Sequence, residues 1–222
     1  MTGALVAVKN LRKSYGQGDS KVEVLKGINL DIHKGETLAL IGKSGSGKST
    51  LLSLLAGLDQ SDAGEIIIDG NNISSMNEKA LTSFRAAHMG IVFQQFHLVS
   101  TLTALENVLL PLELLKRSGA QETARNLLDS VGLSHRSHHL PSQLSGGESQ
   151  RVAIARALAI SPSILFADEP SGNLDEETGD KVMDLLFNMV EKTGTTLVLV
   201  THDQDLAKKC KRVVHLEHGS LQ

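Results

Sequence analysis

The segment Thr37-Leu-Ala-Leu-Ile-Gly-Lys-Ser-Gly-Ser-Gly-Lys-Ser49 decides the fold of this 222-residue chain. Its first five residues are continuously apolar, which is typical of a central strand buried on both faces. The residues from Gly42 to Ser49 fit the pattern G-x-x-x-x-G-K-[ST], and a helix is expected over about 48–58. A Gly-rich loop between a buried strand and a helix predicts a phosphate-binding loop.

Each residue type in this loop suits a phosphate chain. Glycines let the backbone wrap around the phosphates, while the backbone amides and the helix N-terminus supply positive potential. We expect Lys48 to reach the β- and γ-phosphates of a nucleotide and the Ser49 hydroxyl to bind Mg²⁺. The predicted nucleotide contacts in this loop are Gly42, Ser44, Gly45, Ser46, Gly47, Lys48, Ser49 and Thr50.

The rest of the chain predicts an α/β fold around this loop. Residues 28–33 alternate between apolar and polar, as in a half-buried antiparallel strand. The apolar runs 164–167 and 196–200 predict buried strands, and a helix is expected over 176–191 between them. Strands that alternate with helices imply parallel pairing. We therefore expect a mixed, mainly parallel core sheet with an N-terminal antiparallel β-subdomain.

Between these parts, apolar residues recur at helical spacing, for example over 105–115 and 124–131. We expect a single domain over 1–222, in which an α-helical subdomain at about 94–161 is inserted into a core formed by 1–93 and 162–222.

Composition excludes several classes of protein. The net charge of −3 gives no support to nucleic-acid binding, which usually needs a basic excess. The single cysteine, Cys210, cannot form an internal disulfide and fits a reducing compartment. No apolar run approaches the roughly 18 residues that cross a bilayer. We expect an intracellular protein that reaches a membrane only through a partner.

Two carboxylates follow the apolar run 164–167. Ligands of open α/β sheets bind at the carboxyl ends of the strands, where Asp168 and Glu169 are expected. We predict that Asp168 is a direct or indirect Mg²⁺ partner and that Glu169 accepts a proton from the attacking water. His202 follows the run 196–200 and is predicted at the same edge, where it would contact the γ-phosphate and help to position the water.

A second anion site is predicted at Leu144-Ser-Gly-Gly-Glu148. These residues begin a helix for which Ser145 suits the N-cap, so backbone amides are exposed at its N-terminus. Phosphate-loop kinases and GTPases need no such element, which argues against a small-molecule kinase.

This segment resembles the signature of the ATP-binding cassette (ABC) ATPases, and the resemblance extends over essentially the whole chain. It implies that Tyr15, placed after the first strand, is the adenine platform. It also implies that Gln94 is the Q-loop residue, active in catalysis and Mg²⁺ binding, that 171–175 is the D-loop and that His202 is the switch histidine. Gln95 adjoins Gln94, so the choice of the first glutamine rests on the resemblance.

The resemblance further implies a dimer. In this family two cassettes bind head to tail, so that the signature of one cassette closes over the ATP of the other. Ser145, Gly146, Gly147 and Glu148 would then contact nucleotide bound by a second copy, although most members have Gln where this chain has Glu148. A homodimer, or a pair with a similar cassette, is expected, and it would close on ATP binding and reopen after hydrolysis.

The segments 92–96, 167–170 and 172–175 resemble the LolD/MacB-like group of lipoprotein-releasing and macrolide-exporting ATPases, and 16–18 and 178–181 resemble the YbbA-like branch. That group implies an integral membrane permease as partner and mechanotransmission from the cytoplasmic face of the bacterial inner membrane. The alternative is a soluble ABC ATPase of iron–sulfur assembly or another non-transport role.

Overall fold

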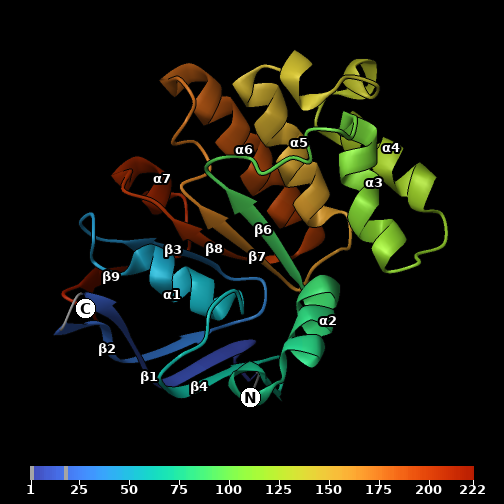
Figure 1. The fold of residues 1–222 in the computed structure, drawn as a ribbon. Coiled ribbons are helices and arrows are strands. Elements are labelled where there is room, and N and C mark those ends of the chain that lie inside the picture. Colours follow the sequence, from blue (N-terminus) through green and yellow to red (C-terminus); the bar gives the residue numbers. More distant parts are fainter. Residues whose placement is uncertain (1–2, 18–19) are drawn as a thin grey trace. The chain divides into compact units, whose positions relative to one another are not determined.

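The computed structural model describes residues 3–17 and 20–222. The chain forms two compact units, one made of Met1–Arg85 with Thr196–Gln222 and the other of Ala86–Thr195. Figure 1 labels most of their helices and strands. Gly18, which belongs to one of the two segments that resemble the YbbA-like branch, lies outside the described residues.

The first unit contains an antiparallel sheet in the order β2-β1-β4-β5. Its strands are β1 (Val6–Gln17), β2 (Ser20–Ile32), β4 (Ala63–Ile68) and β5 (Asn71–Asn72). The apolar residues of the alternating segment in β2, Ile28, Leu30 and Ile32, are all buried, which confirms the expected half-buried strand. The expectation for Tyr15 was wrong in one respect. Tyr15 lies within β1, because the polar end of this strand continues to pair with β2.

The same unit holds the strand that precedes the phosphate loop. This strand, β3 (Thr37–Ile41), pairs in parallel with β8 (Thr196–Val200) and β9 (Arg212–Glu217), and β10 (Ser220–Leu221) is antiparallel to β9. The helices are α1 (Lys48–Leu55), α2 (Glu78–His88), which continues into the second unit, and α7 (Gln204–Lys208), with a 3-10 turn at Ile73–Ser75. Helix α1 ends earlier than expected because Gly57 adopts a left-handed conformation, with φ of 63°.

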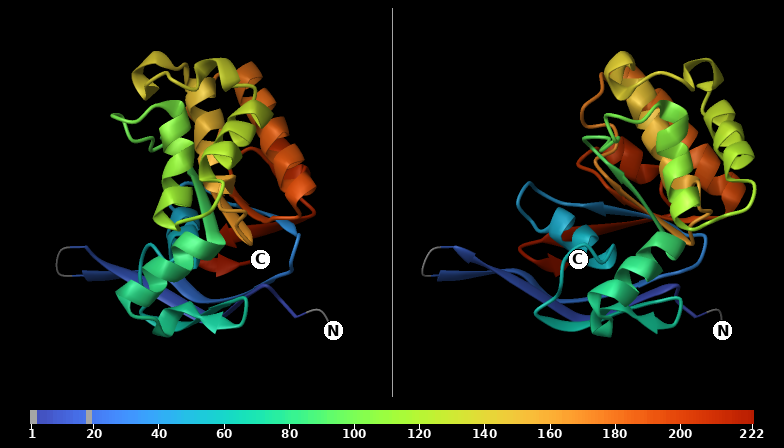
Figure 2. Two further views of the ribbon diagram at one scale, coloured as in Figure 1. Left: turned by 90° about the vertical axis from the view of Figure 1, so that its right-hand side faces the viewer. Right: turned by 45° about the vertical axis from the view of Figure 1, so that its right-hand side comes forward.

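In the second unit, β6 (Met89–Phe93) and β7 (Ile164–Asp168) pair in parallel. The helices are α3 (Ala104–Leu114), α4 (Ala120–Ser130), α5 (Gly146–Leu158) and α6 (Glu176–Thr193), with 3-10 turns at Ser134–Arg136 and Pro141–Gln143. Figure 2 shows α3, α4 and α5 side by side, and α5 also contacts α6. Within the described residues, no helix is both long enough and apolar enough to cross a membrane.

Candidate nucleotide-binding and hydrolysis site

The phosphate loop lies between β3 and α1, as the sequence predicts. The Nζ of Lys48 donates to the backbone oxygens of Gly42 and Lys43 at 2.8 and 3.0 Å, and Lys48 is only 8% exposed. Gly47 precedes α1 with φ of 104° and caps it without a side chain. A Cβ on Gly47 would lie 3.1 Å from side-chain atoms of Val24 and Leu25, so both the backbone conformation and the packing favour glycine here.

The groups of this loop suit a phosphate chain. Ser46 Oγ is shielded from solvent and has no hydrogen-bond partner among the described residues. A buried hydroxyl without a partner is costly, by about 1–3 kcal/mol, unless a ligand supplies one. The first turn of α1 adds the hydroxyls of Ser49 and Thr50 and backbone amides that no side chain caps. Amides, an ammonium group and hydroxyls are the donors and cation ligands that a magnesium nucleotide needs.

Tyr15 is linked to the same helix. Its side chain stands on β1 and is 42% exposed, and its hydroxyl donates to Asp59 Oδ2 at 2.7 Å. The Thr50 hydroxyl also hydrogen-bonds Tyr15. Burial and the bond to Asp59 raise the pKa of Tyr15 above its ordinary value, which keeps the phenol protonated. Asp59 belongs to no sequence motif, so its contact with Tyr15 could not be predicted.

His202 is placed near the phosphate loop by strand register. Leu40 of β3 pairs with Val200 of β8, and the backbone NH of Thr201 donates to the oxygen of Leu40 at 3.3 Å. Gly42 and His202 therefore follow equivalent positions of two adjacent parallel strands. The first unit brings Tyr15, the phosphate loop and His202 to the carboxyl-end region of its parallel strands, where ligands of such sheets bind.

In the second unit, Gln94 and Glu169 directly follow a register pair, Phe93 of β6 and Asp168 of β7. Gln94 is half-buried, whereas Gln95 is exposed. Glu169 has φ of 46°, in the left-handed region that few non-glycine residues occupy. Such conformations cluster at functional sites, and the sequence carries no signal for this one.

Gln94 is held by the D-loop segment. Its Nε2 donates to Asn173 Oδ1 at 3.1 Å, and Asn173 Nδ2 donates back to the oxygen of Gln94 at 3.0 Å. Because the amide nitrogen makes this bond, the amide oxygen is the atom suited to a cation. A Cβ on Gly172 would lie 2.7 Å from Gln94 Nε2, so a glycine permits this close approach.

The predicted helix start at Ser145 is confirmed. The NH of Ser145 donates to Glu148 Oε2 at 2.8 Å and the NH of Glu148 donates to Ser145 Oγ at 3.2 Å, which forms a capping box. Ser145 and Gly146 are exposed, whereas a Cβ on Gly147 would lie 2.5 Å from Thr178 Cγ2 of α6. Gly147 is therefore the residue that lets α5 and α6 approach.

Two further residues of the second unit, which no sequence motif marks, hold the N-terminal part of α5 in place. Gln150 is fully buried, and its Nε2 donates to the oxygen of Pro170 at 2.6 Å, which ties α5 to the turn after β7. Arg136 Nε lies 3.0 Å from Glu148 Oε1. The backbone hydrogen bond from Ser145 is the main cause of the lowered pKa of Glu148, and Arg136 adds to it.

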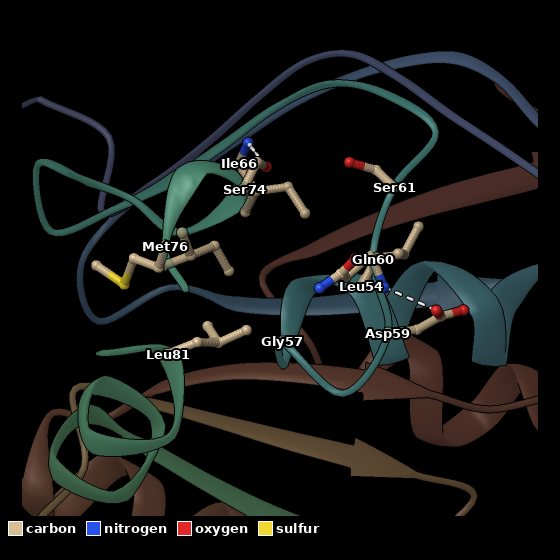
Figure 3. A pocket seen from close by; sticks show the side chains of 10 residues that line it. Leu54, Gly57, Asp59, Gln60, Ser61, Ile66, Ser74, Met76 and Leu81 are labelled. Carbon is tan, nitrogen blue, oxygen red and sulfur yellow. Dashed lines mark hydrogen bonds between the residues drawn. The ribbon is translucent and has the colours of Figure 1, made fainter. Parts of the chain in front are cut away.

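A separate small pocket of about 130 Å³ lies in the first unit. Figure 3 shows Leu54, Ile66, Met76 and Leu81 around it. None of the residues predicted to bind nucleotide lines this pocket.

Residues 25–172 match the ABC transporter family. Among curated proteins, the chain is 52% identical over 220 residues to the uncharacterized ABC transporter ATP-binding protein YbbA of Escherichia coli K12. The matched region covers 98% of this chain and 96% of YbbA. It is 50% identical to the lipoprotein-releasing system ATP-binding protein LolD of Geobacter metallireducens, with 98% of each chain covered.

Among solved structures, the chain resembles the ATP-binding cassette MJ0796 in a dimeric post-hydrolysis state bound to ADP and Pi. The TM-score is 0.90 at 43% identity, with 98% of this chain and 96% of that chain covered. The expected α/β phosphate-loop fold is thereby confirmed. The family model covers most of the chain, and the relatives share about half of its residues along nearly their whole length. This chain therefore belongs to the ABC transporter family, as an ATP-binding and ATP-hydrolysing subunit.

Proposed function

We propose that this chain drives an integral membrane permease from the cytoplasmic face of the bacterial inner membrane, by mechanotransmission of the lipoprotein-releasing type. The observation that carries the cassette-dimer part of this proposal is the capped start of α5, a Ser-Gly-Gly helix N-terminus in addition to the phosphate loop. The relative LolD, named as part of a lipoprotein-releasing system, supports the transport type. The relatives are named as transporter or lipoprotein-releasing proteins, so a role in iron–sulfur assembly is not favoured.

We assign the binding of ATP to the phosphate loop and Tyr15. Lys48, Ser46 and the amides at the start of α1 would hold the phosphates, and the ring of Tyr15 would stack on the adenine. Ser49, Gln94 and Asp168 would hold Mg²⁺, which when bound neutralises negative charge on the phosphates.

Hydrolysis would depend on Glu169 and His202. Glu169 directly follows β7 in a left-handed conformation and would accept the proton of the attacking water. His202 would position that water and contact the γ-phosphate. In this proposal the core is formed by 1–93 and 162–222, and 94–161 is a helical subdomain whose segment 94–100 helps to form the groove for the permease.

The functional form would be a head-to-tail homodimer. Ser145 and Gly146 are exposed at the start of α5, where they are accessible to a second copy of the chain. The signature of each chain would contact the γ-phosphate bound by its partner. An isologous pair with two composite sites is the simplest closed assembly for such a contact.

Dimer formation tests this assignment. Glu169→Gln should trap an ATP-bound dimer, which light scattering coupled to size exclusion would detect. Adding Ser145→Arg to that chain should keep ATP binding but leave a monomer, because the new side chain obstructs the α5 N-terminus. The matched control is Ser134→Arg, on an exposed turn of the same unit, and it should still dimerise. A dimer that survives Ser145→Arg would contradict the composite site.

The transport role needs a test in membranes. The tagged chain should co-purify with an integral membrane protein from detergent-solubilised membranes. Its recovery only from the soluble fraction, with no membrane protein attached, would count against the permease.

A further inference from the structure

We propose that Lys13 and Asp59 are positioning residues that hold the ring of Tyr15 in place for stacking on the base of ATP. The proposal rests on the adenine-platform role assigned to Tyr15 above. It adds two residues that have no motif and that lie outside the phosphate loop.

Asp59 is the centre of the arrangement. It stands on the loop that follows α1, next to Gln60, and its Oδ1 accepts from the backbone NH of Gln60 at 2.7 Å (Figure 3). Lys13 Nζ donates to Asp59 Oδ1 at 2.8 Å and to the backbone oxygen of Gln60 at 2.6 Å. The second carboxylate oxygen, Oδ2, accepts from the Tyr15 hydroxyl at 2.7 Å. One carboxylate therefore binds two side chains of β1.

Lys13 also contacts the ring directly. Its Nζ lies over the ring of Tyr15, 4.9 Å from the centroid. A cation in this position is attracted by the negative face of an aromatic ring. Because the ammonium group occupies one face, a purine would have to stack on the opposite face. The contact thus sets which side of the ring a base can use.

Burying the ammonium group of Lys13 would be unfavourable in free energy without its hydrogen bonds to Asp59 and Gln60. The residue is only 8% exposed, and a buried ammonium group is stable only when it is paired and hydrogen-bonded. By contrast, Lys21 forms an ion pair of 3.5 Å with Asp62 on the same loop while its own side chain remains 70% exposed. Of the two lysine–aspartate pairs beside Tyr15, only Lys13–Asp59 has a buried lysine, and this is the pair to which we assign the positioning role.

The protonation states suit this role. Burial acts to raise the pKa of Asp59, but the hydrogen bonds from Lys13 and Tyr15 outweigh it, so the pKa lies below its ordinary value. Burial and Asp59 raise the pKa of Tyr15. At neutral pH the carboxylate is consequently ionised and the phenol protonated, as the donor and acceptor roles require.

A held ring loses little freedom when a base binds. Ordering a mobile interface side chain weakens binding by about three- to tenfold. Lys13→Met and Asp59→Asn should each raise the Kd for ATP by about this factor and leave kcat at saturating ATP unchanged. The Kd for ATP of the double variant should be no higher than that of the single variant that binds ATP less tightly, because both changes release the same ring.

Two measurements separate this role from a general structural effect. Inorganic tripolyphosphate has no base, so both variants should bind it as tightly as the wild type does. Tyr15 is the only tyrosine and the chain has no tryptophan, so the alkaline ultraviolet titration of phenol reports this residue alone. Its pKa should fall in Asp59→Asn, because the negative charge that opposes phenolate formation is lost.

Lys21→Met is the matched control and should bind ATP like the wild type. Tyr15→Ala separates the two levels of the proposal. If it weakens ATP binding while Lys13→Met and Asp59→Asn do not, the positioning role is wrong and the adenine platform stands. If Tyr15→Ala binds ATP normally, both are wrong. An equal loss of tripolyphosphate and ATP binding in Lys13→Met would also overturn the proposal, because the defect would then lie in the phosphate loop.

Discussion

Arg136 Nε lies 3.0 Å from Glu148 Oε1, so a guanidinium group stands beside the only acidic residue in the first turn of α5. The other oxygen of Glu148 accepts the NH of Ser145. The carboxylate thus completes the capping box while Arg136 offsets its charge. This matters because the start of α5 is proposed to bind the phosphates of a partner's nucleotide, where an uncompensated carboxylate would repel them.

Arg136→Met should weaken ATP-driven dimerisation by about three- to tenfold, because an unbalanced negative charge would remain where the partner's γ-phosphate is proposed to bind. The ATP concentration for half-maximal dimer, measured in the Glu169→Gln chain, gives this factor. Glu148→Gln in the same chain should restore dimerisation, since it removes the charge that Arg136 balanced. A double variant as weak as Arg136→Met would argue against charge compensation.

The lowered pKa of Glu148 predicts a pH dependence of stability. A carboxyl whose folded pKa is depressed stabilises the fold above the ordinary glutamate pKa of about 4.3, and this stabilisation is lost as the pH falls through the lower folded value. Glu148→Gln should therefore be less stable than the wild type by about 1 kcal/mol near neutral pH, and the difference should vanish in acid. Urea unfolding at several pH values measures it; a pH-independent difference would exclude the linkage.

Glu169→Gln should lower kcat for ATP hydrolysis by at least about 100-fold, because the proton acceptor is lost while the shape of the side chain is kept. The Kd for ATP, measured by calorimetry, should change by less than about twofold. Glu177→Gln, at an exposed position of α6, is the control and should hydrolyse ATP normally. Turnover at the wild-type rate in Glu169→Gln would remove Glu169 from the mechanism.

Gly147→Ala should destabilise the chain by about 1–3 kcal/mol, since the new Cβ would overlap Thr178 Cγ2. This result would reverse the usual trend, in which alanine within a helix is more favourable than glycine by about 1 kcal/mol. Thr178→Ser removes Cγ2 and should rescue Gly147→Ala. Denaturant unfolding of the single and double variants tests the contact, and no rescue would mean that the overlap lies elsewhere.

Cys210 should react slowly with thiol reagents at neutral pH. It is buried, and burial raises the pKa of its thiol to about 11, so the reactive thiolate is scarce. The labelling rate of the folded protein should rise as the pH increases towards that value, and denaturant should make labelling fast at neutral pH. Rapid labelling of the native chain would contradict the burial.

The sequence predicted those features that depend on neighbouring residues. Apolar runs located β3 and β8, and the Gly-rich loop located Lys48. The sequence did not reveal partners chosen by tertiary packing. Lys13 and Asp59 are 46 residues apart, and Gln94 and Asn173 are 79 residues apart. The bounds of β1 also depend on its pairing with β2, which is why Tyr15 was expected after that strand rather than within it.

The strand order of the first unit also determines when β3 can pair with its neighbours during protein synthesis. Both parallel neighbours of β3, β8 and β9, lie far downstream, and Gly35 binds Thr196 across 161 residues. At ribosomal rates of about 5–20 residues per second, about 10–30 s pass between the synthesis of β3 and that of β8 and β9. The second unit, Ala86–Thr195, is made in that interval. In a nascent chain, the strand that carries the phosphate loop therefore gains both of its parallel neighbours only after the second unit has been synthesised.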